Sequence, residues 1–159
     1  MSGSLERSPD VAGRRKRLVD LCSALPEAEA ERCGAQHLAF KVRKKIFGYY
    51  AYDHHGDGRI AFLCKAPPGE QGRLVQDSPA RYFVPPYVGP KGWVGFRLDT
   101  RAVDWKVVKN LALVAYFLTA PDSLRRGTST VPSGKRGGSQ HGGSRSGRHP
   151  RSVRGVTAR

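Results

Sequence analysis

Basic side chains gather at two places in the sequence where they can contact phosphate groups. The first group falls within five consecutive positions: Lys41, Arg43, Lys44 and Lys45. The second group is a run near the N-terminus: Arg14, Arg15, Lys16 and Arg17. Each contact with a phosphate adds salt-dependent affinity without reading base sequence. We expect these side chains to bind DNA or RNA, although a charge run is more often a solvated face and a charged corner also protects strand edges.

Aromatic side chains close to the first basic group offer a second type of contact. Four tyrosines can stack on bases: Tyr49, Tyr50, Tyr52 and Tyr82. Aromatic residues are also favoured in strands and in hydrophobic cores. We therefore expect at least half of these tyrosines to be buried.

Histidines and carboxylates do not form a pattern typical of a metal site or an active site. His54 and His55 lie near Asp53 and Asp57. Adjacent residues of an extended chain point to opposite sides, and a glycine-rich loop does not fix them. The acidic cluster has three members, too few for a broad set of hard oxygen ligands: Glu27, Glu29 and Glu31. No nucleophile elbow, Walker loop or HExxH spacing occurs, so we expect no catalytic residues, no metal and no cofactor.

The net charge of +15 is concentrated at the C-terminus. Residues 125–159 contain nine of the 28 Lys and Arg residues and no Asp or Glu, whereas residues 21–124 carry a net charge of only +4. The charge of the whole chain is therefore a poor guide to the folded part. Three cysteines without CxxC spacing predict reduced thiols. The longest apolar run, residues 111–118, is too short to span a bilayer, and we expect a cytoplasmic monomer without a membrane partner.

Two long helices and a short one are predicted from apolar residues at helical spacing. The first helix covers residues 10–25, where Leu18 and Cys22 lie on the buried face. The last begins after Asp104 as N-cap and ends before Pro121. Between them, residues 69–76 form a weak helix, and Ser78 with the following proline opens a helical turn that reaches residue 83.

Alternating apolar and polar residues predict four strands. They cover residues 37–43, 46–53, 59–65 and 93–99. The first three form an antiparallel meander, with a hairpin loop at residues 54–58. In the fourth, Trp93 lies on one face and Val94, Phe96 and Leu98 on the other. The predicted fold is α+β, with an antiparallel sheet of about four strands packed by the N- and C-terminal helices.

A flexible arm (residues 1–9) and a disordered basic tail (residues 125–159) are expected to flank the domain at residues 10–124. The tail has eight glycines and six serines, and it lacks the apolar groups needed to offset the entropy of ordering. Such a tail can add phosphate contacts to nucleic acid. It is equally consistent with an incidental extension or a shifted reading frame, because GC-rich codons read out of frame give Arg, Gly, Ser and Pro.

Eight short motifs follow one another along residues 18–124. They are residues 25–29 (LPEAE), 37–42 (HLAFKV), 45–47 (KIF), 64–65 (CK), 86–89 (PYVG), 92–94 (GWV), 103–105 (VDW), and 115–116 (AY) with 120–121 (AP). In this order they resemble the MmcQ/YjbR family of small bacterial proteins. The resemblance implies a compact α+β domain of the CyaY-like, double-wing kind, and members of this family are commonly labelled DNA-binding proteins.

The function that we expect is non-enzymatic binding of nucleic acid, above all DNA. Phosphate contacts would dominate and sequence specificity would be weak. The alternative is a module that binds a protein or a small ligand through the loop at residues 85–93 and its aromatic rim. A salt series separates the two, because phosphate contacts weaken as salt rises.

Overall fold

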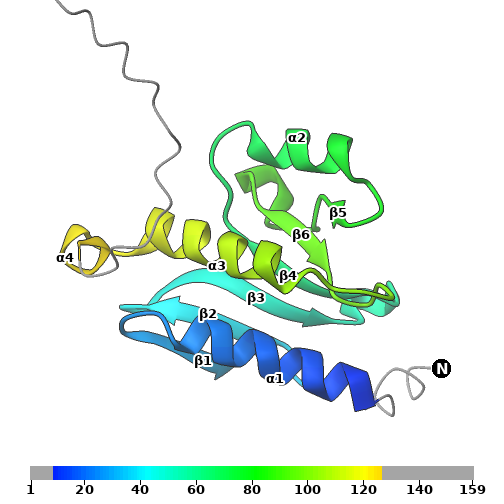
Figure 1. The fold of residues 1–159 in the computed structure, drawn as a ribbon, viewed down its shortest axis with the longest axis horizontal. Helices are drawn as coiled ribbons and strands as arrows, with labels where there is room; N and C mark the ends of the chain where they lie inside the picture. The colour runs from blue at the N-terminus through cyan, green and yellow to red at the C-terminus, as the bar shows by residue number, and fades with distance from the viewer. Residues whose placement is uncertain (1–8, 127–159) are drawn as a thin grey trace, which may run out of the picture. The chain divides into compact units, whose positions relative to one another are not determined.

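The computed structural model describes residues 9–126 of the chain. An antiparallel sheet is the central element of this part (Figure 1). Its strands are β1 (Ala28–Arg32), β2 (Leu38–Val42), β3 (Lys45–Tyr52), β4 (Ile60–Cys64), β5 (Tyr82–Phe83) and β6 (Val94–Arg97). The helices are α1 (Pro9–Ser23), α2 (Glu70–Asp77), α3 (Trp105–Thr119) and α4 (Asp122–Arg125), with 3-10 turns η1 (His54–Gly56) and η2 (Gly89–Lys91). The predictions for the arm and the basic tail concern mainly residues 1–8 and 127–159, which lie outside the described residues.

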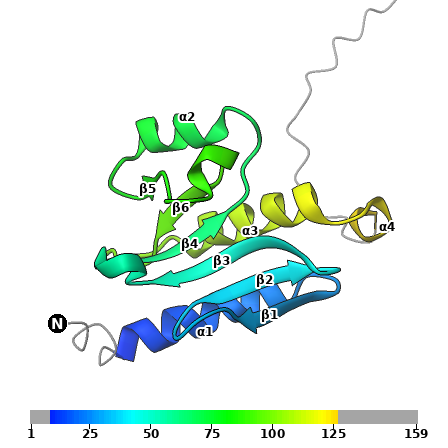
Figure 2. The same cartoon turned by 180° about the vertical axis from the view of Figure 1, so that it is seen from behind.

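The order of the strands across the sheet is β1-β2-β3-β4-β6-β5, and every neighbouring pair is antiparallel (Figure 2). Strands β1 to β4 form a meander. After β4 the chain passes through α2 before β5 and β6 extend the sheet beyond β4. The predicted α+β class is therefore confirmed. The meander predicted for the first three expected strands is also confirmed, and these strands are β2, β3 and β4.

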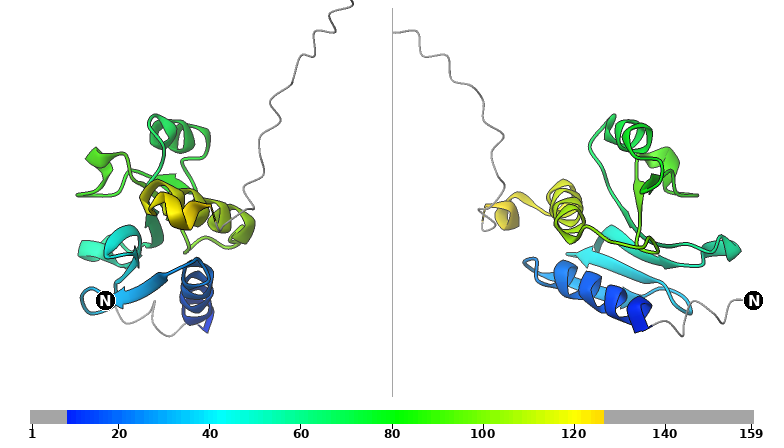
Figure 3. Two further views of the ribbon diagram at one scale, coloured as in Figure 1. Left: turned by 90° about the vertical axis from the view of Figure 1, so that its left-hand side faces the viewer. Right: turned by 45° about the vertical axis from the view of Figure 1, so that its right-hand side comes forward.

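Helices α1 and α3 lie on the same face of the sheet (Figures 1 and 3). Leu18 and Cys22 of α1 are fully buried there, as are Val108 and Tyr116 of α3. Asp104 caps α3 as predicted, because its carboxylate accepts hydrogen bonds from two backbone N–H groups of the first turn. Within residues 9–126, each helix is too short or too polar to cross a membrane.

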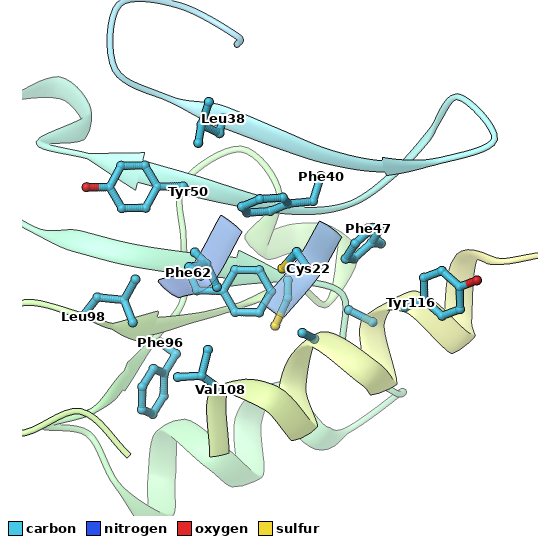
Figure 4. Close-up of a cluster of buried hydrophobic side chains, with 14 of the residues drawn as sticks. Cys22, Leu38, Phe40, Phe47, Tyr50, Phe62, Phe96, Leu98, Val108 and Tyr116 are labelled. Carbon is cyan, nitrogen blue, oxygen red and sulfur yellow. The ribbon is translucent and has the colours of Figure 1, made fainter. Parts of the chain in front are cut away.

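The main hydrophobic core fills the space between these helices and the sheet. Figure 4 shows aromatic rings from three strands meeting in it: Phe40, Phe47 and Phe62. The ring of Phe47 packs edge-on against Tyr116, with centroids 5.8 Å apart. Tyr116 in turn donates a hydrogen bond of 2.7 Å to the carbonyl oxygen of Pro26, which ties α3 to the segment between α1 and β1.

A second, smaller hydrophobic cluster covers the opposite face of the sheet, called here the outer face. Its buried members are Ala51, Ala61, Leu63 and Trp93, and partly buried side chains pack around them. All five residues of β4 are buried because both faces of this central strand are covered. The prediction that Trp93 and Val94 lie on opposite faces is confirmed, since Val94 belongs to the main core.

A β-bulge in β3 changes the spacing of side chains along that strand. Phe40 pairs with Gly48, whereas Lys41 pairs with Ile46, so Phe47 is the extra residue. Gly48 is required at this place, because an added Cβ atom would lie 2.6 Å from Cε2 of Phe62. The bulge lets Phe47 enter the core while Tyr49 turns to the outer face.

The sheet has two edge strands more than the four that were predicted. Strand β1 contains two glutamates and is mostly exposed, so it lacks the hydrophobic alternation of a strand and is held mainly by pairing with β2. Strand β5 has only two residues. The predicted turn after Ser78 is present, because the N–H groups of Arg81 and Tyr82 both donate to the Ser78 carbonyl oxygen at 3.0 Å. It is shorter than predicted, since Tyr82 and Phe83 already pair with β6.

Candidate nucleic-acid interface

The corner between β2 and β3 presents three exposed basic side chains: Arg43, Lys44 and Lys45. Val42 pairs with Lys45, so Arg43 and Lys44 alone form the hairpin loop. Their φ angles are 46° and 66°, both left-handed, as a type I′ turn requires. Asn and Gly usually fill such a turn because other residues are strained there. The chain thus keeps two long basic residues at a place where smaller residues would fold more easily.

Two of the predicted contacts at this corner are paired with glutamates, one in β1 and one directly before it. Lys41 Nζ lies 2.5 Å from Glu31, and the Arg43 guanidinium binds Glu27 with two hydrogen bonds of 2.6 and 3.1 Å. The hydrogen bond with Arg43 lowers the pKa of Glu27, and the bond with Glu31 raises the pKa of Lys41. Lys44 and Lys45, by contrast, have no carboxylate at ion-pair distance among the described residues.

The N-terminal basic run does not form one basic face, because successive residues of α1 point in different directions. Arg14 donates to the carbonyl oxygens of Leu98 and Thr100 at 2.5 and 2.6 Å and therefore anchors α1. The other three side chains have separate surroundings. Arg15 approaches the ring of Tyr50, Lys16 pairs with Asp20, and Arg17 lies over the ring of Trp105. This run starts at the opposite end of the sheet from the β2–β3 corner (Figures 1 and 2).

Two lysines that were not predicted from the sequence, Lys65 and Lys91, join the predicted Lys45 on and beside the outer face. The Lys65 ammonium lies 5.9 Å from the centroid of Trp93, and the Trp93 ring packs on Tyr49 with centroids 5.6 Å apart. Burial lowers the pKa of Lys65, and the positive charges of Lys45 and Lys91 lower it further. We call Lys45, Lys65 and Lys91 the lysine cluster. Its signal in the sequence was the alternation that sends Lys65 and Trp93 to the same face.

Next to this cluster the outer face is hollowed into a pocket of about 300 Å³, called here the aromatic pocket. Strands β3 and β4 supply four of its ten lining residues, Tyr49, Tyr50, Ala51 and Leu63, while the other six come from three loops. These are Cys33 and His37, then His54, then Pro86, Tyr87 and Val88. The loop that the sequence suggested as an alternative binding site therefore forms one wall of the pocket.

Histidine and tyrosine rings make the rim of the aromatic pocket. The His37 and His54 rings meet edge-on with centroids 5.2 Å apart, and Tyr87 Oη lies 3.2 Å from Nε2 of His55. Burial and the neighbouring imidazoles of His55 and His37 lower the pKa of His54. No group of three or more potential ligands within residues 9–126 is arranged to hold a metal ion.

The remaining predicted side chains divide between the core and the outer face. Tyr50, Tyr52 and Tyr82 are buried, whereas Tyr49 is half-buried on the outer face. Burial raises the pKa of the Cys64 thiol to about 12 and also raises that of Cys22, so both are inert packing groups. Of the four tyrosines, Tyr49 is thus the most exposed.

Comparisons with known proteins agree with this fold. The YjbR family model matches residues 23–118. A crystal structure of a Deinococcus radiodurans protein with the domain named DUF419 superposes with a TM-score of 0.56 and 22% sequence identity, over 78% of this chain and 93% of that chain. At this identity the likeness shows the fold alone, and no curated protein matches the chain. Because the family match covers more than half of the sequence, the chain belongs to the YjbR family.

Proposed function

We propose that this protein binds nucleic acid, without catalysing a reaction, through phosphate contacts of the lysine cluster and Lys44. The observation that carries the proposal is the position of Lys65 over the Trp93 ring, with Lys45 and Lys91 close enough that their charges, after burial, help to lower its pKa. Cations held together without carboxylate partners favour binding of a polyanion. Such contacts position a nucleic acid without reading its sequence, so the proposed specificity is weak.

The predicted phosphate contacts contribute unequally in this proposal. Lys44 and Lys45 are retained as direct contacts. Lys41 and Arg43 can contact a phosphate only if each releases its glutamate partner. Such an exchange costs little, because solvent screens exposed ion pairs. The run from Arg14 to Arg17 serves mainly to hold and pack α1, since Arg14 binds backbone carbonyls and Arg17 covers a tryptophan ring.

A salt series on the full-length chain tests the lysine cluster. Replacing Lys45 and Lys91 by Gln removes two phosphate contacts. The negative slope of log K against log salt should then become shallower by about 1.4 for a single strand. The matched control replaces two exposed lysines of α3, Lys106 and Lys109, which lie on the opposite face. If both double variants lose the same amount of salt dependence, the loss reflects net charge alone. The lysine cluster would then not be part of the interface.

The second candidate function is binding of a small ligand in the aromatic pocket. A cavity of about 300 Å³ is at the small end of ligand sites, and a mostly apolar lining with a few polar groups is typical of them. This candidate predicts a ligand affinity that does not depend on salt. The two functions are compatible, since the pocket and the lysine cluster share the same face.

A further inference from the structure

The aromatic pocket and the lysine cluster lie side by side, and Tyr49 contributes to both. Its ring packs on Trp93, which Lys65 covers, and the same ring lines the pocket. Leu63 and Val88 likewise belong both to the hydrophobic cluster under the lysines and to the pocket. A ligand in the pocket therefore lies next to concentrated positive charge.

The lining of the pocket is itself uncharged apart from its histidines. Its ten residues include no Asp, Glu, Lys or Arg. His37 accepts a hydrogen bond from the backbone N–H of Tyr52 at Nδ1, 3.2 Å away, so Nε2 is the ring nitrogen that carries a hydrogen and can donate. The lowered pKa of His54 favours its neutral form as well. The flat faces of these tyrosine and histidine rings, together with a few hydrogen-bond donors and acceptors, are suited to binding a neutral heterocyclic ring.

The loop that carries Tyr87 holds its ring in place at a cost in backbone strain. The N–H of Val88 donates to Pro86 at 2.7 Å, which closes a three-residue γ-turn centred on Tyr87 with a φ of 64°. Turns of this kind are rare and strained. Tyr87 nevertheless stays 72% exposed, so the turn does not serve to bury its ring. Strained residues cluster at ligand sites, where the surrounding structure compensates for them.

Neighbouring contacts fix this loop and the facing loop before any ligand arrives. The Gln71 side chain donates to the carbonyl oxygens of Gly89 and Trp93 at 2.7 and 2.5 Å. On the other side of the pocket, Asp53 accepts from the Gly58 N–H at 2.8 Å, and Asp53 and His55 both have positive φ. The pocket is thus preorganised, which reduces the entropy lost on binding.

We propose that the aromatic pocket holds one unstacked base of a single-stranded nucleic acid, with the adjoining phosphates on the lysine cluster. The inference rests on the proposed function and adds the class of nucleic acid. A neutral aromatic pocket beside a cationic surface matches a neutral ring joined to an anion, which is the chemistry of a nucleotide. Bases of a duplex are paired and stacked, so only an unpaired base can enter and stack on tyrosine and histidine rings.

The test compares a labelled single-stranded oligothymidylate with a duplex of equal length, using the full-length chain. Tyr87→Gly removes the ring and relieves the positive φ, so folding is preserved. We expect it to weaken single-strand binding about tenfold, the effect of losing one stacked base. The salt slope and the duplex affinity should stay within error of the original protein. Leu118→Ala, which shortens an exposed side chain of α3, is the matched control and should change neither.

Crosslinking provides a readout that does not depend on the variants. An oligonucleotide with a single 5-iodouracil, irradiated with the unchanged protein, should become attached to a pocket residue such as Tyr87, Tyr49 or His54 in mass spectra of the peptides. Attachment only at residues outside the pocket would overturn the inference. So would saturable binding of free thymidine monophosphate in the pocket without binding of the oligonucleotide, because the base would then come from a free nucleotide.

The outcomes distinguish this inference from the proposed function. If single strands and duplexes bind equally and Tyr87→Gly has no effect, while the Lys45 and Lys91 replacements still lower the salt slope, the base pocket is wrong and phosphate binding stands. If the unchanged protein binds neither oligonucleotide at low salt, both proposals fail together.

Discussion

Lys65 shows at the scale of a single residue how the proposed interface is built. Its ammonium group lies over Trp93 and close to two further lysines. An aromatic ring attracts such a cation, whereas neighbouring cations and burial disfavour it. A bound phosphate would relieve that repulsion, so the charge that is costly in the free protein becomes favourable in the complex.

Gly48 is a second residue with a sharply defined role, because it makes room for the Phe62 ring inside the core. We expect Gly48→Ala to destabilise the protein by about 1–3 kcal/mol, since its Cβ atom would lie 2.6 Å from that ring and 3.1 Å from a backbone oxygen. Thermal unfolding followed by circular dichroism measures the effect. The control is Gly13→Ala in α1, where a Cβ atom meets nothing within 4 Å, and there helix propensity should raise stability. Equal shifts for both variants would contradict the packing seen at Gly48.

At the scale of elements, the β2–β3 hairpin combines strain with a basic surface. Its two loop residues have left-handed φ angles although neither is glycine or asparagine. Natural proteins often retain such strain where it serves binding, at some cost in stability. The hairpin therefore allows stability and binding to be separated by one substitution.

Replacing Lys44 by glycine is expected to stabilise the hairpin and weaken binding. Glycine adopts a φ of 66° without a steric penalty, which should raise the free energy of unfolding by about 0.5–1 kcal/mol after its greater unfolded-state entropy is counted. Denaturant unfolding and a salt series measure the two effects. Lys44→Ala removes the same charge but keeps the strain, so it should weaken binding without stabilising the protein. A stability gain in the alanine variant as well would show that charge repulsion, not the turn, was relieved.

The sequence predicted those elements whose burial leaves a periodic pattern. The apolar faces of α1 and α3 and the alternation in β2, β3, β4 and β6 are all visible, because each packs against a core. Strand β1 is an exposed edge rich in Glu, and β5 is too short for a pattern. The turn that opens at Ser78 was visible from its residue types, but the pairing of Tyr82 and Phe83 with β6 was not.

The candidate site was predictable only in part, because its pieces are far apart in the sequence. The basic corner was visible as a run of like residues. The aromatic pocket combines loops around residues 33–37, 54 and 86–88 with the floor of the sheet. No local pattern indicates that Tyr87 takes a positive φ or that Lys91 approaches Lys65. Likewise, the pairing of Lys41 and Arg43 with glutamates depends on β1, which the sequence did not reveal.

At the scale of the whole molecule, the distribution of charge decides how binding must be interpreted. Most of the net charge of +15 lies outside residues 21–124, which carry +4. Affinity of the full-length chain for nucleic acid would therefore combine the domain with the basic C-terminal residues, and salt dependence alone would not separate them. The described residues 9–126 form a compact unit with its own core, and the family match lies within it. A chain that ends at Ser129 is thus a suitable protein for measuring the domain by itself.

Binding of this shortened chain to a single-stranded oligonucleotide over a salt series measures the lysine cluster and the aromatic pocket without the basic C-terminal residues. We expect measurable binding at low salt. Replacing Lys45 and Lys91 by Gln should make the salt dependence less steep, and replacing Tyr87 by Gly should lower the affinity. Circular dichroism should first show that the shortened chain keeps the thermal unfolding of the full-length protein. If the folded, shortened chain binds no oligonucleotide at low salt, the domain is not a nucleic-acid interface, and any affinity of the full-length protein comes from the residues after Ser129.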